Sequence, residues 1–320
     1  MKKKLSLLLI IVMVVTILAG CGTTSTSDDG EKQIRIGASI LTQSHPFYVS
    51  IKTALEQEAV NQNVALDISV ADQDLNRQIS AIEDFINKGV DAIIITPVDS
   101  DGVKGAILKA QAANIPVVTV DIRANDVEVG SHIATDNYSG GMIAAEAMAQ
   151  YLDGVGDIGL ITYPEVQSVR DRIDGFKEIS ATHEGLKIVA ELPGRTRQEA
   201  KSASEDMLTS NPNLKGIFGF GDDMAIAANA AITERNSSAI VVGFDGLEEA
   251  RNSVDVDNAF KAVVVQYPEK MGSLGVINAV KLAKGEAVDK EVPVTPGLYI
   301  YGKGFVDVAV ENGKVIVDVK

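Results

Sequence analysis

Short apolar segments alternate with longer segments of helical periodicity along most of the chain. From Ile34 onward several apolar segments are continuous runs, such as Ala92–Ile95 and Ala239–Val242. Such runs are typical of strands buried on both faces of a parallel sheet. The predicted strands are Ile34–Ile40, Val64–Val70, Asp91–Thr96, Pro116–Val120, Gly156–Thr162, Leu186–Leu192, Gly216–Phe220, Ala239–Phe244 and Lys261–Gln266.

The segments between these strands have the length and spacing of amphipathic helices. Ile79, Ile82 and Ile86 recur at three- and four-residue intervals, and Gly89 follows as a helix stop. This alternation of strands and helices predicts an α/β fold of βαβ units in doubly wound sheets.

Two of the predicted strands end in an aspartate. Asp121 follows Pro116–Val120, and Asp245 follows Ala239–Phe244, which suggests two similar lobes. Ligands of open α/β sheets bind outside the carboxyl ends of the strands, so the two carboxylates are candidates to face a cleft from opposite lobes. Alternatively, each aspartate caps the next helix or turn.

The C-terminal stretch differs in character from the rest. Phe305–Val310 and Lys314–Val319 flank Glu311, Asn312 and Gly313. Asn-Gly between alternating β-formers predicts a β-hairpin, which we interpret as structural.

The first 33 residues predict export. Three lysines precede a mostly apolar run from Leu5 to Leu18, which at about 14 residues is too short for a membrane-spanning helix of about 20. Leu18-Ala19-Gly20-Cys21 resembles a bacterial lipobox, which predicts a signal peptide over residues 1–20 and a lipid on Cys21, the only cysteine. Residues 21–33 then form a lipidated, flexible tether. The alternative is an ordinary signal peptide that is cut elsewhere.

Composition narrows the class of partner. The 320 residues include 29 basic and 44 acidic side chains, a net charge of −15 that disfavours nucleic acid. A hydrophobic fraction of 46% excludes global disorder. No second long apolar run follows the first, so we expect an anchored rather than a spanning protein.

Signatures of catalysis are scarce. The sequence has no Gly-x-Ser-x-Gly elbow, no His-Glu-x-x-His and no P-loop. One cysteine and three histidines (His45, His132 and His183) make a Cys/His metal site an unattractive interpretation. Asp222 and Asp223 are expected to start a helix, although a hydrolase acting through this pair stays an alternative. We therefore expect no enzyme activity, no cofactor and no metal.

Several polar and aromatic residues at predicted strand ends suit a sugar. Carboxylate, guanidinium and amide groups bind neighbouring hydroxyls, and aromatic rings pack on the apolar faces of sugars. His45, Phe47 and Tyr48 follow the first strand, Arg170 follows the strand ending near Thr162, and Gln266 ends another strand. Phe47 and Tyr48 could equally be core residues at the start of a helix.

The sequence from about Ile34 to Pro293 resembles the ribose-type periplasmic substrate-binding proteins of ABC importers. The matching segments are Pro46–Ser50, Asn114–Asp121, Ser131–Asn137, Gly221–Ala225 and Val242–Gly246. The resemblance implies two Rossmann-like lobes joined by three crossovers, with the ligand trapped between them when the hinge closes. The implied lobes are residues 34–135 with 267–294, and residues 136–266 with 295–320.

The resemblance also implies a set of ligand-contacting residues. Asp121, Arg170, Asp245 and Gln266 retain the family's polar types, and Phe47 with Tyr48 occupies its aromatic pair. The departures from the ribose pattern are His45 for an Asn, Ile122 for an Arg, Thr196 for an aromatic residue and Gly221 for an Asn. Because buried polar groups left unpaired cost about 1–3 kcal/mol each, we expect a hexose, a cyclic polyol or another hydroxylated compound rather than ribose held in the ribose manner.

Taken together, these features predict a lipid-anchored, exported, monomeric protein that captures a monosaccharide or polyol and delivers it to the permease of an ABC importer. The alternative is a sensor module that presents its ligand to a membrane receptor or kinase.

The lipid anchor is directly testable. Cys21→Ser removes the thiol that would carry the lipid, so the variant should leave the membrane fraction for the medium or periplasm. Fractionation followed by immunoblotting measures this. A variant that stays fully membrane-bound would contradict lipid anchoring.

Overall fold

The computed structural model describes residues 33–256 and 259–319. The predicted signal peptide, Cys21 and all of the predicted tether except Gln33 lie outside the described residues. Within the described ranges, no helix combines the length and the apolar character that crossing a membrane requires.

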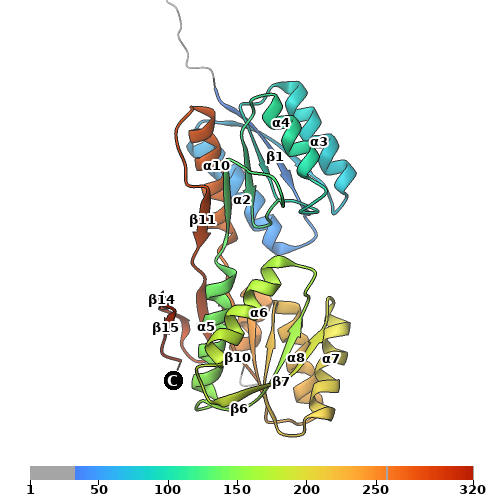
Figure 1. Cartoon of the computed structure of the whole chain (residues 1–320), viewed down its shortest axis with the longest axis vertical. Coiled ribbons are helices and arrows are strands. Elements are labelled where there is room, and N and C mark those ends of the chain that lie inside the picture. Colours follow the sequence, from blue (N-terminus) through green and yellow to red (C-terminus); the bar gives the residue numbers. More distant parts are fainter. Residues whose placement is uncertain (1–32, 257–258, 320) are drawn as a thin grey trace, which may run out of the picture. The chain divides into compact units, whose positions relative to one another are not determined.

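The described chain forms two α/β lobes (Figure 1). The first lobe contains β1 (Arg35–Ile40), α2 (Pro46–Asn61), β2 (Ala65–Val70), α3 (Leu75–Lys88), β3 (Ala92–Ile95), α4 (Lys104–Ala112), β4 (Val117–Val120), β5 (Ser131–Thr135), α10 (Pro268–Ala283) and β11 (Glu291–Val294). Its strands are all parallel, in the order β11-β5-β4-β3-β1-β2.

The second lobe repeats this plan with an antiparallel edge. It contains α5 (Asn137–Tyr151), β6 (Val155–Thr162), α6 (Gln167–Ser180), β7 (Gly185–Pro193), α7 (Arg197–Ser210), β8 (Leu214–Gly219), α8 (Asp222–Glu234), β9 (Ile240–Asp245), α9 (Glu248–Val254), β10 (Phe260–Val265), β12 (Gly297–Ile300) and β13 (Gly304–Val306). The strand order is β13-β12-β10-β9-β8-β6-β7, in which β12 and β13 pair antiparallel.

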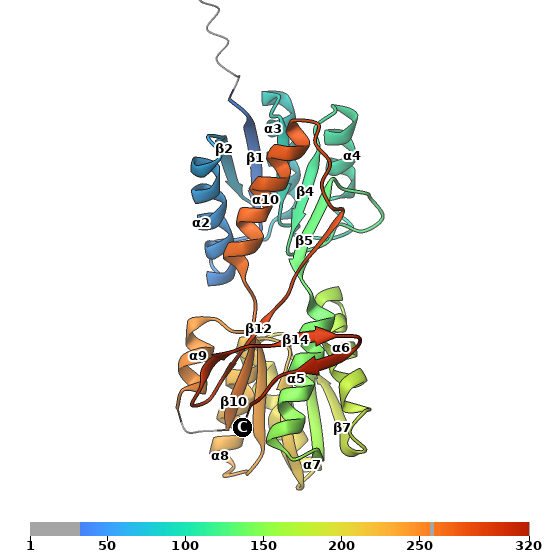
Figure 2. The same cartoon turned by 90° about the vertical axis from the view of Figure 1, so that its left-hand side faces the viewer.

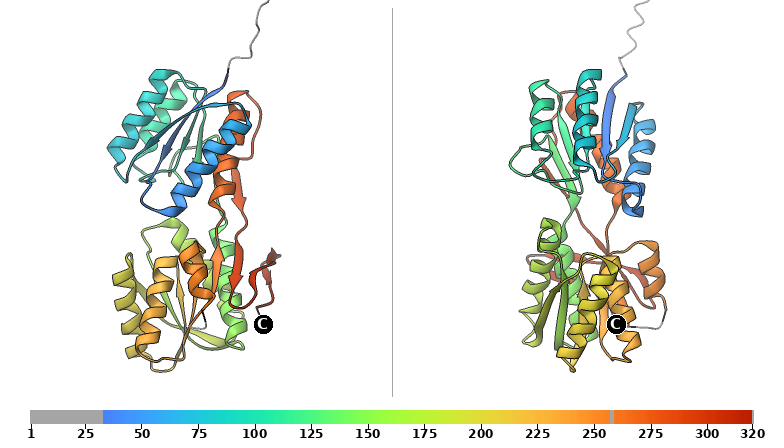
Figure 3. Two further views of the ribbon diagram at one scale, coloured as in Figure 1. Left: turned by 180° about the vertical axis from the view of Figure 1, so that it is seen from behind. Right: turned by 90° about the vertical axis from the view of Figure 1, so that its right-hand side faces the viewer.

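Helices cover both faces of each sheet, as the continuous apolar strands predict. In β3, Ala92 and Ile94 pack toward α2 and α10, whereas Ile93 and Ile95 pack toward α3 and α4. Figure 2 shows α10 lying across the first-lobe strands, and Figure 3 shows the second-lobe sheet between α5 on one side and α7 and α8 on the other. Adjacent residues of one strand therefore serve two separate cores.

The chain passes between the two sheets three times within the described residues. The crossings run from β5 to α5, from β10 to α10, and from β11 to β12. The predicted two-lobed, three-crossover architecture is confirmed. Strands β5, β11 and β12 are absent from the sequence prediction. In β5, Ser131, His132 and Thr135 are buried although they are polar, so the segment lacks the apolar pattern that predicts a buried strand.

The predicted C-terminal hairpin is also confirmed, but it is shorter than expected. β14 (Ala309–Glu311) pairs with β15 (Lys314–Ile316), and Asn312 and Gly313 between them both have positive φ, as Asn-Gly hairpin turns require. Phe305 belongs instead to β13. The Gln150 side chain of α5 holds the end of the chain by donating to Val317 O at 2.9 Å and accepting from Val319 N at 3.1 Å.

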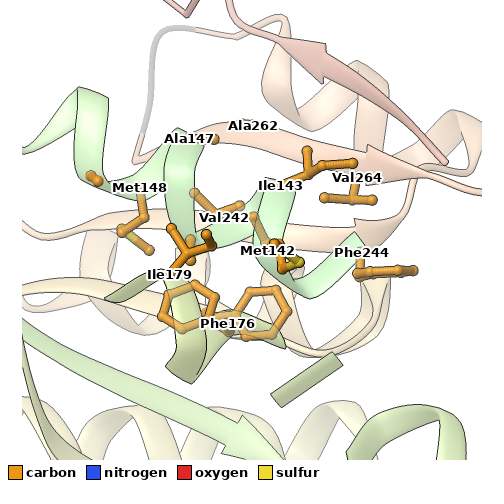
Figure 4. Close-up of a cluster of buried hydrophobic side chains, with 14 of the residues drawn as sticks. Met142, Ile143, Ala147, Met148, Phe176, Ile179, Val242, Phe244, Ala262 and Val264 are labelled. Atoms are coloured by element: carbon orange, nitrogen blue, oxygen red, sulfur yellow. The ribbon is translucent and has the colours of Figure 1, made fainter. Parts of the chain in front are cut away.

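Helices α5 and α6 approach each other closely through glycines. A Cβ at Gly141 would lie 2.0 Å from Arg172 O, and one at Gly175 would lie 2.0 Å from Tyr138 O. Figure 4 shows the adjoining core, in which Met142, Ile143, Ala147 and Met148 of α5 lie near Phe176, Ile179, Val242 and Phe244. The missing side chains allow α6 to bring Arg172 against the start of α5.

This close packing predicts a large difference between two Gly→Ala variants. Gly141→Ala forces a methyl group into backbone atoms and should lower the free energy of unfolding by about 1–3 kcal/mol. Gly105→Ala in α4 is the control, because the added Cβ would have no atom within 4 Å apart from its chain neighbours and the backbone of its own helix; it should be neutral or slightly stabilising. Urea unfolding measures both. Equal stability of the two variants would contradict the close contact.

Candidate functional site

Asp121 lies at the carboxyl end of β4 in the first lobe. Its backbone adopts φ of +67°, a conformation that is uncommon for residues other than glycine. The Tyr48 hydroxyl, from the first turn of α2, donates to Asp121 Oδ2 at 2.9 Å. His45 caps that turn, where its Nδ1 accepts from Phe47 N at 3.3 Å. Among residues 33–256 and 259–319, no hydrogen bond engages Asp121 Oδ1, which leaves that oxygen available to a ligand.

The Asp121 carboxyl is difficult to ionise. Burial raises its pKa to about 6; the negative charge of Asp245 adds to the shift, while the Tyr48 hydrogen bond and the positive charge of Arg172 oppose it. Burial also raises the pKa of the Tyr48 hydroxyl, with Asp121 as the next cause. The charges of Asp245 and Arg172 in the second lobe therefore act on the carboxylate of the first.

Asp245 is the corresponding residue of the second lobe, at the end of β9 with φ of +96°. Its Oδ1 accepts from Arg172 Nη1 at 3.0 Å and from Gln266 Nε2 at 2.7 Å. The Arg172 guanidinium carbon lies 3.8 Å from the centroid of the Phe244 ring, a cation–π geometry. The Asp245 carboxylate is thus held by the guanidinium of Arg172 from α6 and by the side-chain amide of Gln266, which follows β10.

Asp222 anchors the loop that follows Asp245. It begins α8, as predicted, but its carboxylate accepts from the backbone N–H groups of Gly246 at 3.0 Å and Leu247 at 2.7 Å. Burial, followed by the charge of Asp245, raises the pKa of Asp222. Within the described part of the chain, no backbone N–H of the residues directly after Asp121 or Asp245 donates to its carboxylate, so neither caps the helix or turn that follows it. Asp245 Oδ2 instead accepts from the backbone N–H of Asp222, at the start of the preceding helix α8, at 3.4 Å.

Two cavities border these carboxylates, and each is lined by both lobes. The first, of about 650 Å³, includes Asp121 and Ile122 from one lobe and Arg170 from the other. The second, of about 800 Å³, includes His45 from one lobe and Gly221, Asp245 and Gln266 from the other. Both volumes fall in the range of about 300–1,000 Å³ that small-molecule sites occupy.

The remaining predicted residues lie in different settings. Phe47 is 5% exposed and packs in the first-lobe core, as the alternative interpretation had it. Thr196 caps α7 by accepting from Glu199 N at 3.2 Å, and it is not among the lining residues of either cavity. A Cβ at Gly221 would lie 3.1 Å from Asp245 Oδ2, so even an alanine would crowd that carboxylate.

Arg172, rather than Arg170, contacts Asp245. Arg170 is partly exposed on α6 and bonds to Gln167 and to the Pro164 carbonyl, whereas Arg172 is 7% exposed. The sequence reasoning missed Arg172, although the periodicity contains the signal. Arg172 adjoins Ile173 and lies four residues before Phe176 on the apolar face of α6, and a charged residue on a buried face usually has a specific partner.

Arg123 does not replace the guanidinium that is absent at position 122. It forms a bidentate pair with Glu291 of β11, with N–O distances of 2.7 and 2.6 Å. Burial, helped by the charge of Arg123, lowers the pKa of nearby His132 to about 4. In the described ranges, no cluster of three His, Cys, Asp or Glu residues could hold a metal ion.

Comparisons with known proteins agree with this geometry. A family model for the periplasmic binding protein domain matches residues 36–287. The ribose import binding protein RbsB of Bacillus subtilis is 32% identical over 300 residues, covering 91% of this chain and 97% of that protein. A solute-binding protein from Actinobacillus succinogenes with bound D-allose has a TM-score of 0.77 and 26% identity, covering 83% of this chain and 97% of the other. One from Bacillus halodurans with bound myo-inositol has a TM-score of 0.75 and 25% identity, covering 84% and 94%.

The raised pKa of Asp121 predicts a pH-dependent stability difference. Between the unfolded pKa of about 3.9 and the folded value of about 6, the native protein binds more protons than the unfolded chain, so this residue's contribution to stability falls as pH rises. Asn cannot ionise. Asp121→Asn should therefore gain about 2 kcal/mol relative to the parent between pH 4 and pH 7, measured by urea unfolding without ligand.

Tyr48→Phe provides a second test of the same carboxyl, because it removes a donor that favours the ionised form. The pKa of folded Asp121 should rise further in this variant, which raises the upper end of the pH window while the lower end, set by the unfolded pKa, stays the same. A parent-to-Asp121→Asn difference that is the same at pH 4 and pH 7 would show that folding does not raise the pKa of Asp121.

Proposed function

The chain belongs to the periplasmic binding protein family, and from this premise we propose that it is the solute-binding protein of an ABC importer. We propose further that it is exported, anchored by a lipid on Cys21, and specific for a neutral monosaccharide or polyol. The family and the named relatives are those of binding proteins, so the expectation of a non-enzymatic protein is confirmed.

The observation that supports this function most strongly is the pair of strand-end carboxylates from opposite lobes. Asp121 has one oxygen without a hydrogen-bond partner in the described residues, and Asp245 is held by Arg172 and Gln266. Carboxylates accept from sugar hydroxyls, and the Arg172 guanidinium donates to a sugar oxygen. A ligand that bonds to both lobes would stabilise the closed arrangement of the hinge.

The charges of the site favour a neutral ligand. Two carboxylates face one guanidinium that is already paired with Asp245, so an anionic sugar acid would be repelled. The position next to Asp121 is occupied by Ile122, and Arg123 is committed to Glu291. Ribose held through an arginine at that position would therefore lack its donors.

A thermal-shift screen tests the proposed ligand class. The panel comprises D-ribose, D-allose, xylitol and myo-inositol, with D-gluconate as the anionic control. A ligand at a hundredfold excess over its Kd adds about 2.7 kcal/mol of stability, so one or a few neutral compounds should raise Tm without being consumed. D-Ribose should rank below the best compound. Selective stabilisation by D-gluconate, or turnover of a compound, would contradict the proposal.

The two carboxylates should each be essential for affinity. Asp121→Ala and Asp245→Ala each remove charge-assisted hydrogen bonds of about 1.5–3 kcal/mol, so titration calorimetry with the best neutral compound should show a loss of about tenfold to several hundredfold. Asp223→Ala is the matched control, because that carboxylate lines the second cavity but is bonded to Arg197 at 2.6 Å. Asp121→Ala and Asp245→Ala variants that bind the compound as tightly as the parent would contradict the proposal that these carboxylates contact the ligand.

A further inference from the structure

Five residues form a closed circuit of hydrogen bonds between the binding site and the hinge. Thr135 Oγ1 donates to Gln266 Oε1 at 2.6 Å, and Gln266 Nε2 donates to Asp245 Oδ1 at 2.7 Å. Arg172 Nη1 donates to the same Asp245 oxygen at 3.0 Å, and Arg172 Nε donates to Asn137 Oδ1 at 2.8 Å. Asn137 Nδ2 donates to Thr135 O at 3.0 Å, which closes the circuit. We name this circuit the hinge network.

The hinge network is buried, and its hydrogen bonds fix the orientation of both amide side chains. Thr135 is 5% exposed, Gln266 7%, Arg172 7% and Asn137 9%. Each amide side chain uses its oxygen as an acceptor and its nitrogen as a donor, so flipping either amide would break two bonds at once. Buried networks whose members are all satisfied fix one arrangement of their side chains.

The network joins two of the three crossings. Thr135 ends β5 and Asn137 begins α5, so both flank the first crossing. Gln266 follows β10 directly and precedes α10, which places it in the second crossing. Only Asp245 and Arg172 lie within the second lobe proper. A rotation of backbone torsions at either crossing would therefore change the bonds that orient Asp245.

We propose that Thr135 and Asn137 are positioning residues, which act through Gln266 and Arg172 to link the orientation of the Asp245 carboxylate to the conformation of the hinge. The proposal rests on the proposed function, because it treats Asp245 as a ligand contact. Neither Thr135 nor Asn137 needs to touch the ligand: Asn137 holds the far edge of the guanidinium, and Thr135 fixes the amide of Gln266. Ligand binding at Asp245 would then favour one conformation of both crossings.

Two variants break the network on opposite sides. Thr135→Val keeps the shape of the side chain but removes the donor to Gln266, and Asn137→Ala removes the acceptor of Arg172 Nε. Each should weaken binding of the most stabilising neutral compound of the panel about fivefold, the effect of one net hydrogen bond. Because one break already opens the circuit, the double variant should lose clearly less than the product of the two single losses.

A readout without ligand separates coupling from local damage, with Asn137→Ala as the decisive variant, because Thr135 bonds directly to Gln266 whereas Asn137 acts through Thr135 and Arg172. Hydrogen–deuterium exchange of the backbone should accelerate several-fold in residues 262–270 of the second crossing, although both substitutions lie in the first. Thr135→Ser restores the hydroxyl and should restore both exchange and affinity. Thr119→Val is the control, since Thr119 is a buried threonine of the same lobe that bonds to His132 at 2.9 Å outside the network; it should leave exchange in 262–270 and affinity unchanged.

The outcomes separate this inference from the proposed function. Exchange in 262–270 that stays at the parent rate in both variants overturns the hinge network as a coupling device, and so does faster exchange without loss of affinity. If no compound of the panel stabilises the parent, the proposed function fails for those ligands, while exchange in 262–270 still decides whether the two crossings are coupled. If Thr135→Val does not fold, Asn137→Ala carries the same test.

Discussion

The buried ion pair between Arg172 and Asp245 is the interaction on which the site depends. Removing one partner from such a pair leaves an uncompensated buried charge, which costs about 3–5 kcal/mol. The protein satisfies the guanidinium further with Asn137, the Phe220 carbonyl and the Phe244 ring. Arg172 can reach all of these only because glycines at the contact of α5 and α6 let the two helices approach closely.

The two lobes place their strand-end aspartates in the same way but stabilise them with different partners. Each ends a buried strand in an aspartate with positive φ, and each directs that carboxylate toward a cavity lined by both lobes. The second lobe compensates its aspartate with a guanidinium, whereas in the first lobe, among the described residues, the carboxylate of Asp121 accepts a hydrogen bond from the neutral Tyr48 hydroxyl alone. This asymmetry explains why burial raises the pKa of Asp121 to about 6, and it gives the site a surplus of acceptors that suits a ligand rich in hydroxyl donors.

Local patterns in the sequence were sufficient for most of the fold and for the strand-end aspartates. Continuous apolar runs predicted the strands that helices cover on both sides, and Asn312-Gly313 predicted the hairpin turn. Strand β5 was not predicted because Ser131, His132 and Thr135 are polar; they are buried there and form hydrogen bonds. Arg172 was missed for a related reason: a motif match identifies the segment, but the face of the helix decides which arginine is buried.

The sequence by itself therefore determined the two-lobed α/β class, most of the alternating strands and helices, and the positions of Asp121 and Asp245, because these depend on residue periodicity and on where a strand stops. Only the tertiary structure decided the partners of those carboxylates. Tyr48 and Asp121 are 73 positions apart, as are Arg172 and Asp245, and Thr135 and Gln266 are 131 apart. Such pairs meet through sheet order, helix packing and the hinge crossings, which no local pattern of residues encodes.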